Sequence, residues 1–141
     1  RFVEPHWSTL RRFTPARAFE QIVAPQWEAF CGEAFERLCR EALPLLYEAE
    51  GVTGKFEVGE FWDRTTQIDV VGLRSDGWID LGECKWHGRP AVAETSRELA
   101  ARVVHYPVQR RTVRERLFLR TRPKACPPAI VVHDRSSLYD A

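Results

Sequence analysis

The sequence predicts a single α/β domain in which helices flank a mixed central β-sheet. Three observations predict it: a long helical stripe comes first, short strand-like runs between glycine-containing turns follow, and a second helical stretch precedes further strand-like runs. At 141 residues the chain is long enough for one core and too short for two ordinary domains.

Residues 1–13 mix aromatic and basic residues without clear periodicity and are interpreted as a connecting arm. Thr14 and Pro15 form a helix start, and Pro25 is expected to end this short helix near Ala24. The predicted organisation is therefore an N-terminal arm and short helix over residues 1–25, followed by the main domain over residues 26–141.

The main domain opens with the strongest helical pattern in the chain. From about Gln26 to Leu43, apolar residues recur at steps of three and four, which predicts a helix that packs on a sheet. Pro44 is expected to end the regular helix, with scope for a kink and one more turn.

Strand-like runs over residues 55–62, 66–73 and 78–86 come next, and the turn Ser75-Asp76-Gly77 indicates a hairpin between the last two. Pro90 opens a helix through about His105. Residues 116–120 and 129–133 are the remaining predicted strands.

Composition places the chain among globular proteins, with 44% hydrophobic and 29% charged residues. No apolar run approaches the ~18 residues that span a bilayer, so we expect a soluble protein without a membrane partner.

The chain begins at Arg1 and contains no methionine, and we interpret it as a piece of a larger protein. Its net charge of +1 lacks the strongly basic balance typical of many nucleic-acid-binding domains.

The four cysteines are widely spaced and include no C-x-x-C pair, so neither a zinc site nor a disulfide framework is expected. This usage fits a reducing cytoplasm. They are Cys31, Cys39, Cys84 and Cys126.

Charged residues on the predicted hairpin form the main candidate site. If the turn contains three residues, Asp69 lies opposite Glu83, and Lys85 projects from the same face. Two facing carboxylates repel each other unless a cation neutralises them, and a hard ion such as Mg²⁺ or Mn²⁺ prefers such oxygen ligands. The backbone carbonyl of Cys84 would be a further ligand. A two-residue turn would instead send the carboxylates to opposite faces and remove the site.

The spacing alone also fits an exposed Glu83–Lys85 pair with Asp69 at the start of its strand. In that alternative the hairpin charges form a surface salt-bridge network without chemistry.

The motifs QIDVVGL and GECKW together resemble the D-x(n)-E-x-K signature of PD-(D/E)XK nucleases. With RFVEP, GEAFERLCREAL and GEFWDRTTQIDVVGL they resemble more narrowly the C-terminal domain of prokaryotic DEXX-box (AAA-type) ATPases. The resemblance spans most of residues 1–86. It implies a restriction-endonuclease-like core in the order αβββαβ, and an ATPase domain in the same full-length chain. No phosphate-binding G-x-x-x-x-G-K-[ST] loop is present, so ATP hydrolysis would reside outside these 141 residues.

In the function that the resemblance implies, this is a metal-dependent nuclease domain that hydrolyses nucleic acid, with DNA the expected substrate. Asp69 and Glu83 hold Mg²⁺ or Mn²⁺, Lys85 orients or activates water, and Glu36 of the long helix is an additional acidic residue. The alternative is a catalytically inactive nuclease-fold module that binds DNA or protein beside an ATPase. A homodimer that cuts both strands is left open.

A basic segment follows the second predicted helix and is the candidate contact with phosphates. A solvated basic face is the competing interpretation. Its candidate nucleic-acid-binding residues are Arg110, Arg111, Arg114, Arg120, Arg122 and Lys124.

Aromatic and histidine residues give weaker signals. Trp62 and Trp78 could stack on bases, but aromatic residues in strands more often fill a core. His87, His105 and His133 are each conceivable general bases, although lone histidines at such places are more often surface or capping residues.

Overall fold

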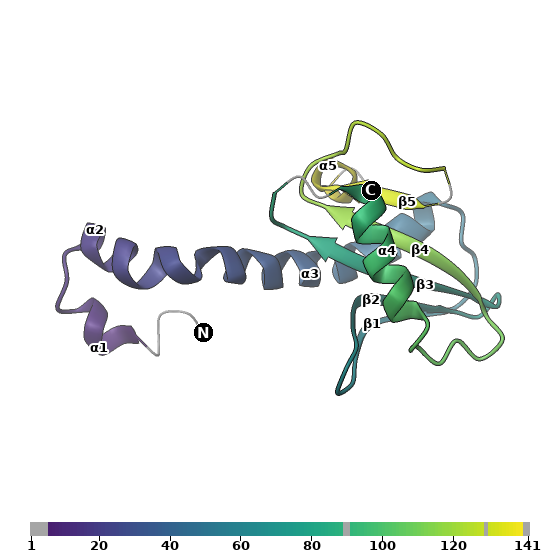
Figure 1. The fold of residues 1–141 in the computed structure, drawn as a ribbon, viewed down its shortest axis with the longest axis horizontal. Helices are drawn as coiled ribbons and strands as arrows, with labels where there is room; N and C mark the ends of the chain where they lie inside the picture. The colour runs from purple at the N-terminus through teal and green to yellow at the C-terminus, as the bar shows by residue number, and fades with distance from the viewer. Residues whose placement is uncertain (1–5, 89–90, 129, 140–141) are drawn as a thin grey trace.

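The computed structural model describes residues 6–88, 91–128 and 130–139, and its body is a five-stranded mixed sheet between a long and a shorter helix (Figure 1). Within these residues, no helix combines the length and the apolar character that crossing a membrane requires. The strands are β1 (Phe56–Trp62), β2 (Gln67–Arg74), β3 (Trp78–Lys85), β4 (Thr112–Leu119) and β5 (Val131–Asp134). The helical segments are α1 (Trp7–Leu10), α2 (Pro15–Ala18), the π-helical turn η2 (Phe19–Val23), α3 (Ala24–Ala49), α4 (Val92–Val103) and α5 (Arg135–Tyr139).

The strands lie in the sheet in their chain order, β1-β2-β3-β4-β5. β1, β2 and β3 form an antiparallel meander, whereas β4 and β5 run parallel to β3. The direction changes where α4 connects β3 to β4, because a parallel neighbour requires a crossover. The predicted α/β class with a mixed sheet is confirmed. β4 begins four residues before the predicted run at 116, because Thr112 pairs with Trp78 and the ladder continues from there.

The turn between β2 and β3 has the length on which the candidate site depends. Gly77 has a φ of 87°, a left-handed conformation that glycine adopts without steric cost. The Trp78 amide donates to Asp76 Oδ1 at 3.2 Å, and Arg74 forms an ion pair with Asp76. The three residues 75–77 therefore form a turn fixed at both ends.

The long helix differs from its prediction at both prolines. α2, η2 and α3 follow one another without interruption, so Pro25 does not end the helix. It lies in the first turn of α3, where its missing N–H matters least, directly after the wider π-helical turn. α3 also continues past Pro44 to Ala49, because packing against the sheet offsets the cost of a helical proline, about 3 kcal/mol. The predicted domain boundary after residue 25 thus falls inside a continuous helical path and stays a prediction.

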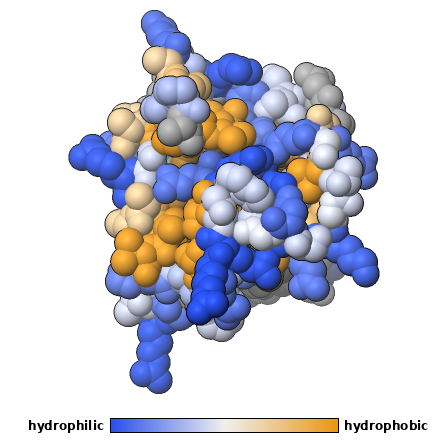
Figure 2. All heavy atoms as spheres, turned by 90° about the vertical axis from the view of Figure 1, so that its right-hand side faces the viewer, coloured by the Kyte–Doolittle hydropathy of each residue, from blue (hydrophilic) through white to orange (hydrophobic). Residues whose placement is uncertain are grey.

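Only the C-terminal half of α3 packs on the sheet, and its N-terminal half projects from the body (Figure 1). The apolar stripe from Gln26 to Leu43 was predicted to pack on a sheet, and in the structure its burial begins at Phe35. Trp27 and Phe30, 46% and 45% exposed, stack on each other with ring centroids 5.8 Å apart. At the opposite end of the molecule, polar side chains dominate the surface, with smaller apolar areas between them (Figure 2).

Two apolar layers hold the sheet between the helices. Where the strands are regular, alternate residues face the two layers, as the pleat requires. The layer under α3 contains Phe35, Cys39, Ala42, Leu43, Leu46, Tyr47, Val70, Cys84, Phe118 and Leu138. The layer under α4 contains Ile68, Val71, Ile79, Leu81, Val92, Leu99, Leu117 and Leu119.

A buried polar network joins the end of α3 to β3, β4 and β5. Arg116, fully buried, donates through Nε to Asp80 Oδ1 at 2.6 Å and through its two Nη atoms to the Glu50 carboxylate at 2.5 and 2.6 Å. The Tyr47 hydroxyl donates to the other Asp80 oxygen at 2.7 Å. His133 Nε2 lies 3.0 Å from Arg116 Nη1, and burial together with that positive charge lowers the pKa of His133 to about 4. His133 is therefore a neutral member of this network.

We expect Arg116→Ala to lower the free energy of unfolding by about 3–5 kcal/mol, because it leaves Asp80 and Glu50 without their shared cation in a buried setting. Urea denaturation followed by circular dichroism measures the change.

The matched control is Arg37→Ala. Arg37 pairs with Glu41 one helical turn away, but both side chains are exposed, so no measurable loss of stability is expected. Equal losses in the two variants would contradict the structural role given to the network.

Candidate functional site

Asp69 lies at an irregularity of β2. Between the pairs Gly59–Val71 and Phe61–Ile68, β2 holds one residue more than β1. The extra residue makes a β-bulge that includes Asp69, and a bulge redirects the side chains it carries. The regular alternation of the strand is therefore broken at the aspartate.

The pairing of β2 with β3 brings Asp69 to the backbone of β3. Val70 is opposite Gly82, the register that the three-residue turn predicts, and the two-residue alternative is excluded. Beyond this pair the Asp69 carboxylate itself contacts β3, because its Oδ2 accepts a hydrogen bond from the Cys84 amide at 2.9 Å. Gln67 Nε2 lies 3.3 Å from the other carboxylate oxygen, Oδ1.

Glu83 is buried on β3, and two cations compensate its charge. Lys85 Nζ lies 2.8 Å from Glu83 Oε1, and Arg102 of α4 pairs with Glu83 Oε2. Lys85 is about one third exposed and also contacts Glu98 of α4 at 3.2 Å. The lysine thus connects a buried carboxylate with the surface of the molecule.

Burial raises the pKa of both carboxyl groups, and the charge of Asp69 adds to the shift of Glu83. Burial is the main reason that the pKa of Asp69 is raised above its ordinary value of 3.8, and the hydrogen bond from Cys84 opposes this shift. The pKa of Glu83 is raised above 4.5 by burial and then by the charge of Asp69. The pKa of Lys85 is also raised, because its contacts with Glu83 outweigh the opposing effect of burial. Nearby carboxyl groups with disturbed pKa values are typical of functional sites.

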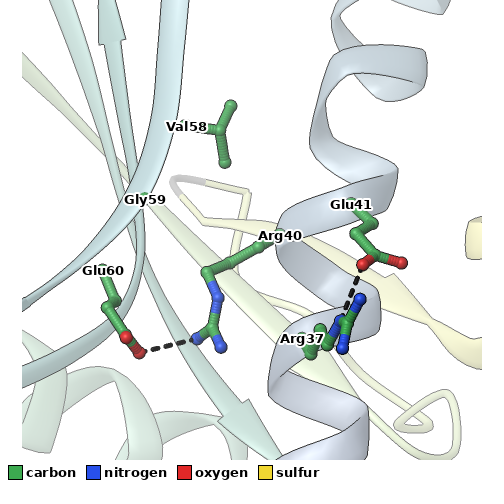
Figure 3. Close-up of a pocket in the computed structure, with 6 residues that line it drawn as sticks. All are labelled: Arg37, Arg40, Glu41, Val58, Gly59 and Glu60. Atoms are coloured by element: carbon green, nitrogen blue, oxygen red, sulfur yellow. Dashed lines mark hydrogen bonds and ion pairs between the residues drawn. The ribbon is translucent and has the colours of Figure 1, made fainter.

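Glu36 of α3 belongs to the same electrostatic group. Its pKa is raised by burial first and by the charge of Asp69 second, with smaller contributions from Glu60 and Glu83. Arg40, one turn further along α3, donates to the Asp69 carbonyl oxygen at 2.8 Å and forms an ion pair with Glu60 at 3.1 Å. Figure 3 shows Arg40 reaching from α3 toward β1 across a pocket of about 290 Å³.

Sequence reasoning missed Arg102, Arg40, Glu60 and Gln67. A signal for Arg102 was present, because it follows the inward-facing Leu99 by three residues and so lies on the same side of α4. Gln67 and Glu60 make their contacts beside the bulge, and no local sequence pattern indicates that bulge.

The predicted basic segment is divided between the two ends of β4. Arg110, Arg111 and Arg114 lie at its beginning, where Arg111 Nη1 donates to the Arg74 carbonyl oxygen at 2.7 Å. Arg120, Arg122 and Lys124 are exposed residues beyond its end. The Arg120 amide donates to the Lys85 carbonyl oxygen at 3.1 Å, so only this second group lies at the end of the sheet that carries Lys85.

The remaining predicted candidates are distributed over several elements. His87 Nδ1 lies 2.9 Å from Glu28 of α3 at the surface, and His105 follows α4. Trp78 is partly buried, with the Arg114 guanidinium over its ring. Trp62 is 74% exposed, so the interpretation of this residue as core is wrong.

Comparison with protein-family models matches residues 1–99 with DUF234, described as archaeal and bacterial proteins of unknown function. The chain belongs to this family. Its matched region includes Glu36, Asp69, Glu83 and Lys85 and ends before Arg102. No curated protein and no solved structure matches the chain.

The carboxylates of this DUF234 chain suit a hard divalent ion. Among the described residues, no group of three or more His, Cys, Asp or Glu side chains forms a ready metal cage. Mg²⁺, however, commonly binds one or two carboxylates and keeps several waters. Asp69 and Glu83 offer two, and both have raised pKa values, caused first by burial, so that a bound cation would stabilise their charged forms. Binding would require Glu83 to share the oxygens that now pair with Lys85 and Arg102.

For this DUF234 chain we expect Asp69→Asn to raise the melting temperature at pH 7 by up to about 4 °C. A carboxyl group whose pKa is higher in the folded protein than in the unfolded protein stabilises the fold at pH values below its pKa in the unfolded state. This contribution is lost as the pH rises past its pKa in the folded state. The neutral amide should therefore be favourable at neutral pH, and its advantage should disappear toward pH 4. The melting temperatures of the wild type and the variant, measured between pH 4 and pH 7, give the difference.

Asp76→Asn is the control with the opposite sign, because the hydrogen bond from Arg74 lowers the pKa of Asp76. This variant should not be stabilised at pH 7. Destabilisation by Asp69→Asn at every pH would contradict the electrostatic strain assigned to the site.

Proposed function

We propose that this chain is a metal-dependent nuclease domain that hydrolyses phosphodiester bonds of nucleic acid, with DNA the expected substrate. The observation that carries the proposal is the meeting of Asp69 and Glu83, buried and mutually repelling, beside the partly exposed amine of Lys85. The resemblance to the PD-(D/E)XK signature involves the same three residues.

The arrangement of elements supports a restriction-endonuclease-like core. A helix, an antiparallel three-stranded meander, a second helix and a strand parallel to the third follow one another in the chain. The bulge and the end of the β2–β3 pairing lie beside the carboxylates. Fold and motif together favour this core, and the proposed reaction follows from the residues of the site.

Each residue has a role that follows from its contacts. Asp69 and Glu83, with the Cys84 carbonyl, would hold Mg²⁺ or Mn²⁺, which supplies an activated water and neutralises charge on the phosphate. Lys85 is placed to orient the attacking water and to offset negative charge as it develops. Glu36 adds negative charge to the side of the site that faces α3, and it would contact a bound cation directly or through a water molecule.

We further propose that Arg120, Arg122 and Lys124 contact phosphates of the bound strand, because they follow the end of β4 that lies beside Lys85. The three residues at the other end of β4 lie about 20 Å or more away along the strand, too far to serve the same phosphate group.

The surroundings of the protein are part of the proposal. From the resemblance we infer an ATPase domain in the same full-length chain. From the cysteine usage we infer a cytoplasmic setting. Pairing of two copies would allow both strands of a duplex to be cut.

One observation favours a second candidate, an inactive module of the same fold that binds DNA or protein. Glu83 already pairs with both Lys85 and Arg102, so its charge is compensated without a metal ion. The two candidates differ in their response to divalent ions.

Lys85→Ala and Asp69→Ala are each expected to reduce Mg²⁺-dependent cleavage of DNA by at least about 100-fold, the size of effect typical for a general acid-base or electrostatic group. Cleavage is measured on labelled DNA with and without EDTA. Lys55→Ala is the matched control, because Lys55 lies at the beginning of β1 beside Ser75, at the opposite end of the β2–β3 hairpin.

Mn²⁺ should also raise the melting temperature of the wild type, because a ligand that binds only the folded state stabilises it. Asp69→Ala should remove this increase. Full cleavage in both site variants would exclude the mechanism, whereas a wild type that neither cleaves DNA nor responds to Mn²⁺ would favour the inactive module.

Neutralising Arg120 and Arg122 together with glutamine is expected to weaken DNA binding and to reduce its dependence on salt, with about one unit of salt slope per lost phosphate contact. Fluorescence anisotropy at several salt concentrations measures both. Arg110→Gln, at the other end of β4, should leave the slope unchanged, and salt-independent binding by the wild type would contradict the assignment.

A further inference from the structure

The β1–β2 connection carries an aromatic side chain that the fold does not use. Trp62 ends β1 and is 74% exposed, whereas its neighbour Phe61 turns inward and packs edge-on against Tyr106 at 4.9 Å. Figure 1 shows this connection projecting from the body of the molecule. A tryptophan that contributes so little to the core is available for a ligand.

The tip next to Trp62 is held by a fixed turn. Asp63 Oδ1 accepts hydrogen bonds from the amides of Thr65 and Thr66, both at 2.7 Å, and the Asp63 amide donates to the Thr66 carbonyl oxygen at 2.9 Å. These backbone hydrogen bonds lower the pKa of Asp63, so its carboxylate is stabilised by the turn. The indole is thus presented on an ordered support, which reduces the entropy lost on binding.

The tip adjoins the candidate site through Gln67. Trp62 pairs with Gln67 across the hairpin, and the Gln67 amide reaches Asp69 Oδ1 at 3.3 Å. An open pocket of about 440 Å³ occupies this place, a volume within the usual range for ligand sites. It is lined by Trp62, Asp63, Thr65, Thr66 and Gln67. A group bound against the indole would therefore lie beside the carboxylates.

We propose that Trp62 stacks on an unpaired base of a single-stranded nucleic acid, and that this contact positions the strand beside Asp69. The inference rests on the proposed nuclease function and names its substrate class. An indole needs an open base face, which neighbouring pairs cover in a regular duplex but which a single strand, a flap or a loop exposes. Exposed Arg64 at the same tip supplies a cation for the adjoining phosphate.

The test compares binding of a 12-nucleotide oligo(dT) strand with binding of a blunt 12-base-pair duplex, in EDTA so that neither is cut. Trp62→Ala should weaken binding of the single strand by about 5-fold to 100-fold, the effect of losing one base-aromatic stack, with little change for the duplex. Trp62→Phe should recover most of the loss. Fluorescence anisotropy gives the affinities, and circular dichroism verifies that each variant is folded.

Trp27→Ala is the matched control, because Trp27 is also an exposed tryptophan but lies on the projecting part of α3. It should bind both probes as the wild type does. An unchanged affinity of Trp62→Ala for oligo(dT), an equal loss on both probes, or no binding of oligo(dT) by the wild type would each overturn the inference. The inference would also be overturned if the wild type forms a dimer and Trp62→Ala abolishes it, because the indole would then belong to a protein interface.

The two proposals fail separately. If Lys85→Ala abolishes cleavage while Trp62→Ala cleaves single strands with an unchanged KM, the nuclease function stands and the role of Trp62 falls. If Trp62→Ala loses affinity for oligo(dT) but no metal-dependent cleavage exists, the stacking site stands without the nuclease.

Discussion

The repulsion between Asp69 and Glu83 is the constraint on which the arrangement around them depends. Burial raises the pKa of both carboxyl groups, and the charge of Asp69 raises that of Glu83 further; such a pair persists only where donors and cations surround it. The Cys84 amide, Lys85 and Arg102 supply them from one strand, β3, and one helix, α4. Every element that touches the pair is therefore held in place by charge as well as by apolar packing.

Local patterns in the sequence predicted the sheet because each strand obeys a local rule. Alternation marks β2 and β3, and Ser75-Asp76-Gly77 has a residue capable of positive φ where the turn needs one. The register that brings Asp69 to β3 follows from that turn and was predictable for the same reason. Helix bounds were less predictable: a proline lowers helical propensity locally, but at Pro44 packing with the sheet outweighs that cost.

What escaped prediction depends on contacts between distant segments. The bulge at Asp69 arises from the mismatch of β1 with β2, and no short motif encodes it. Arg102 meets Glu83 only because α4 crosses the sheet at that point. Arginines that are close in sequence were grouped as one surface, yet β4 is an extended strand and separates Arg114 from Arg120 by most of its length. Arg116, which lies between them in the sequence, is buried in the polar network and is not part of a surface.

The continuous helix has a mechanical consequence. Its projecting half, with Trp27 and Phe30, and its anchored half, with Glu36 and Arg40, belong to one stiff rod. A rod fixed at one end acts as a lever, so a sideways load on the aromatic end tilts the segment beside the sheet. Such a tilt would change how closely Glu36 approaches Asp69 while leaving the strand pairing intact, and the acidity of Glu36 would change with it.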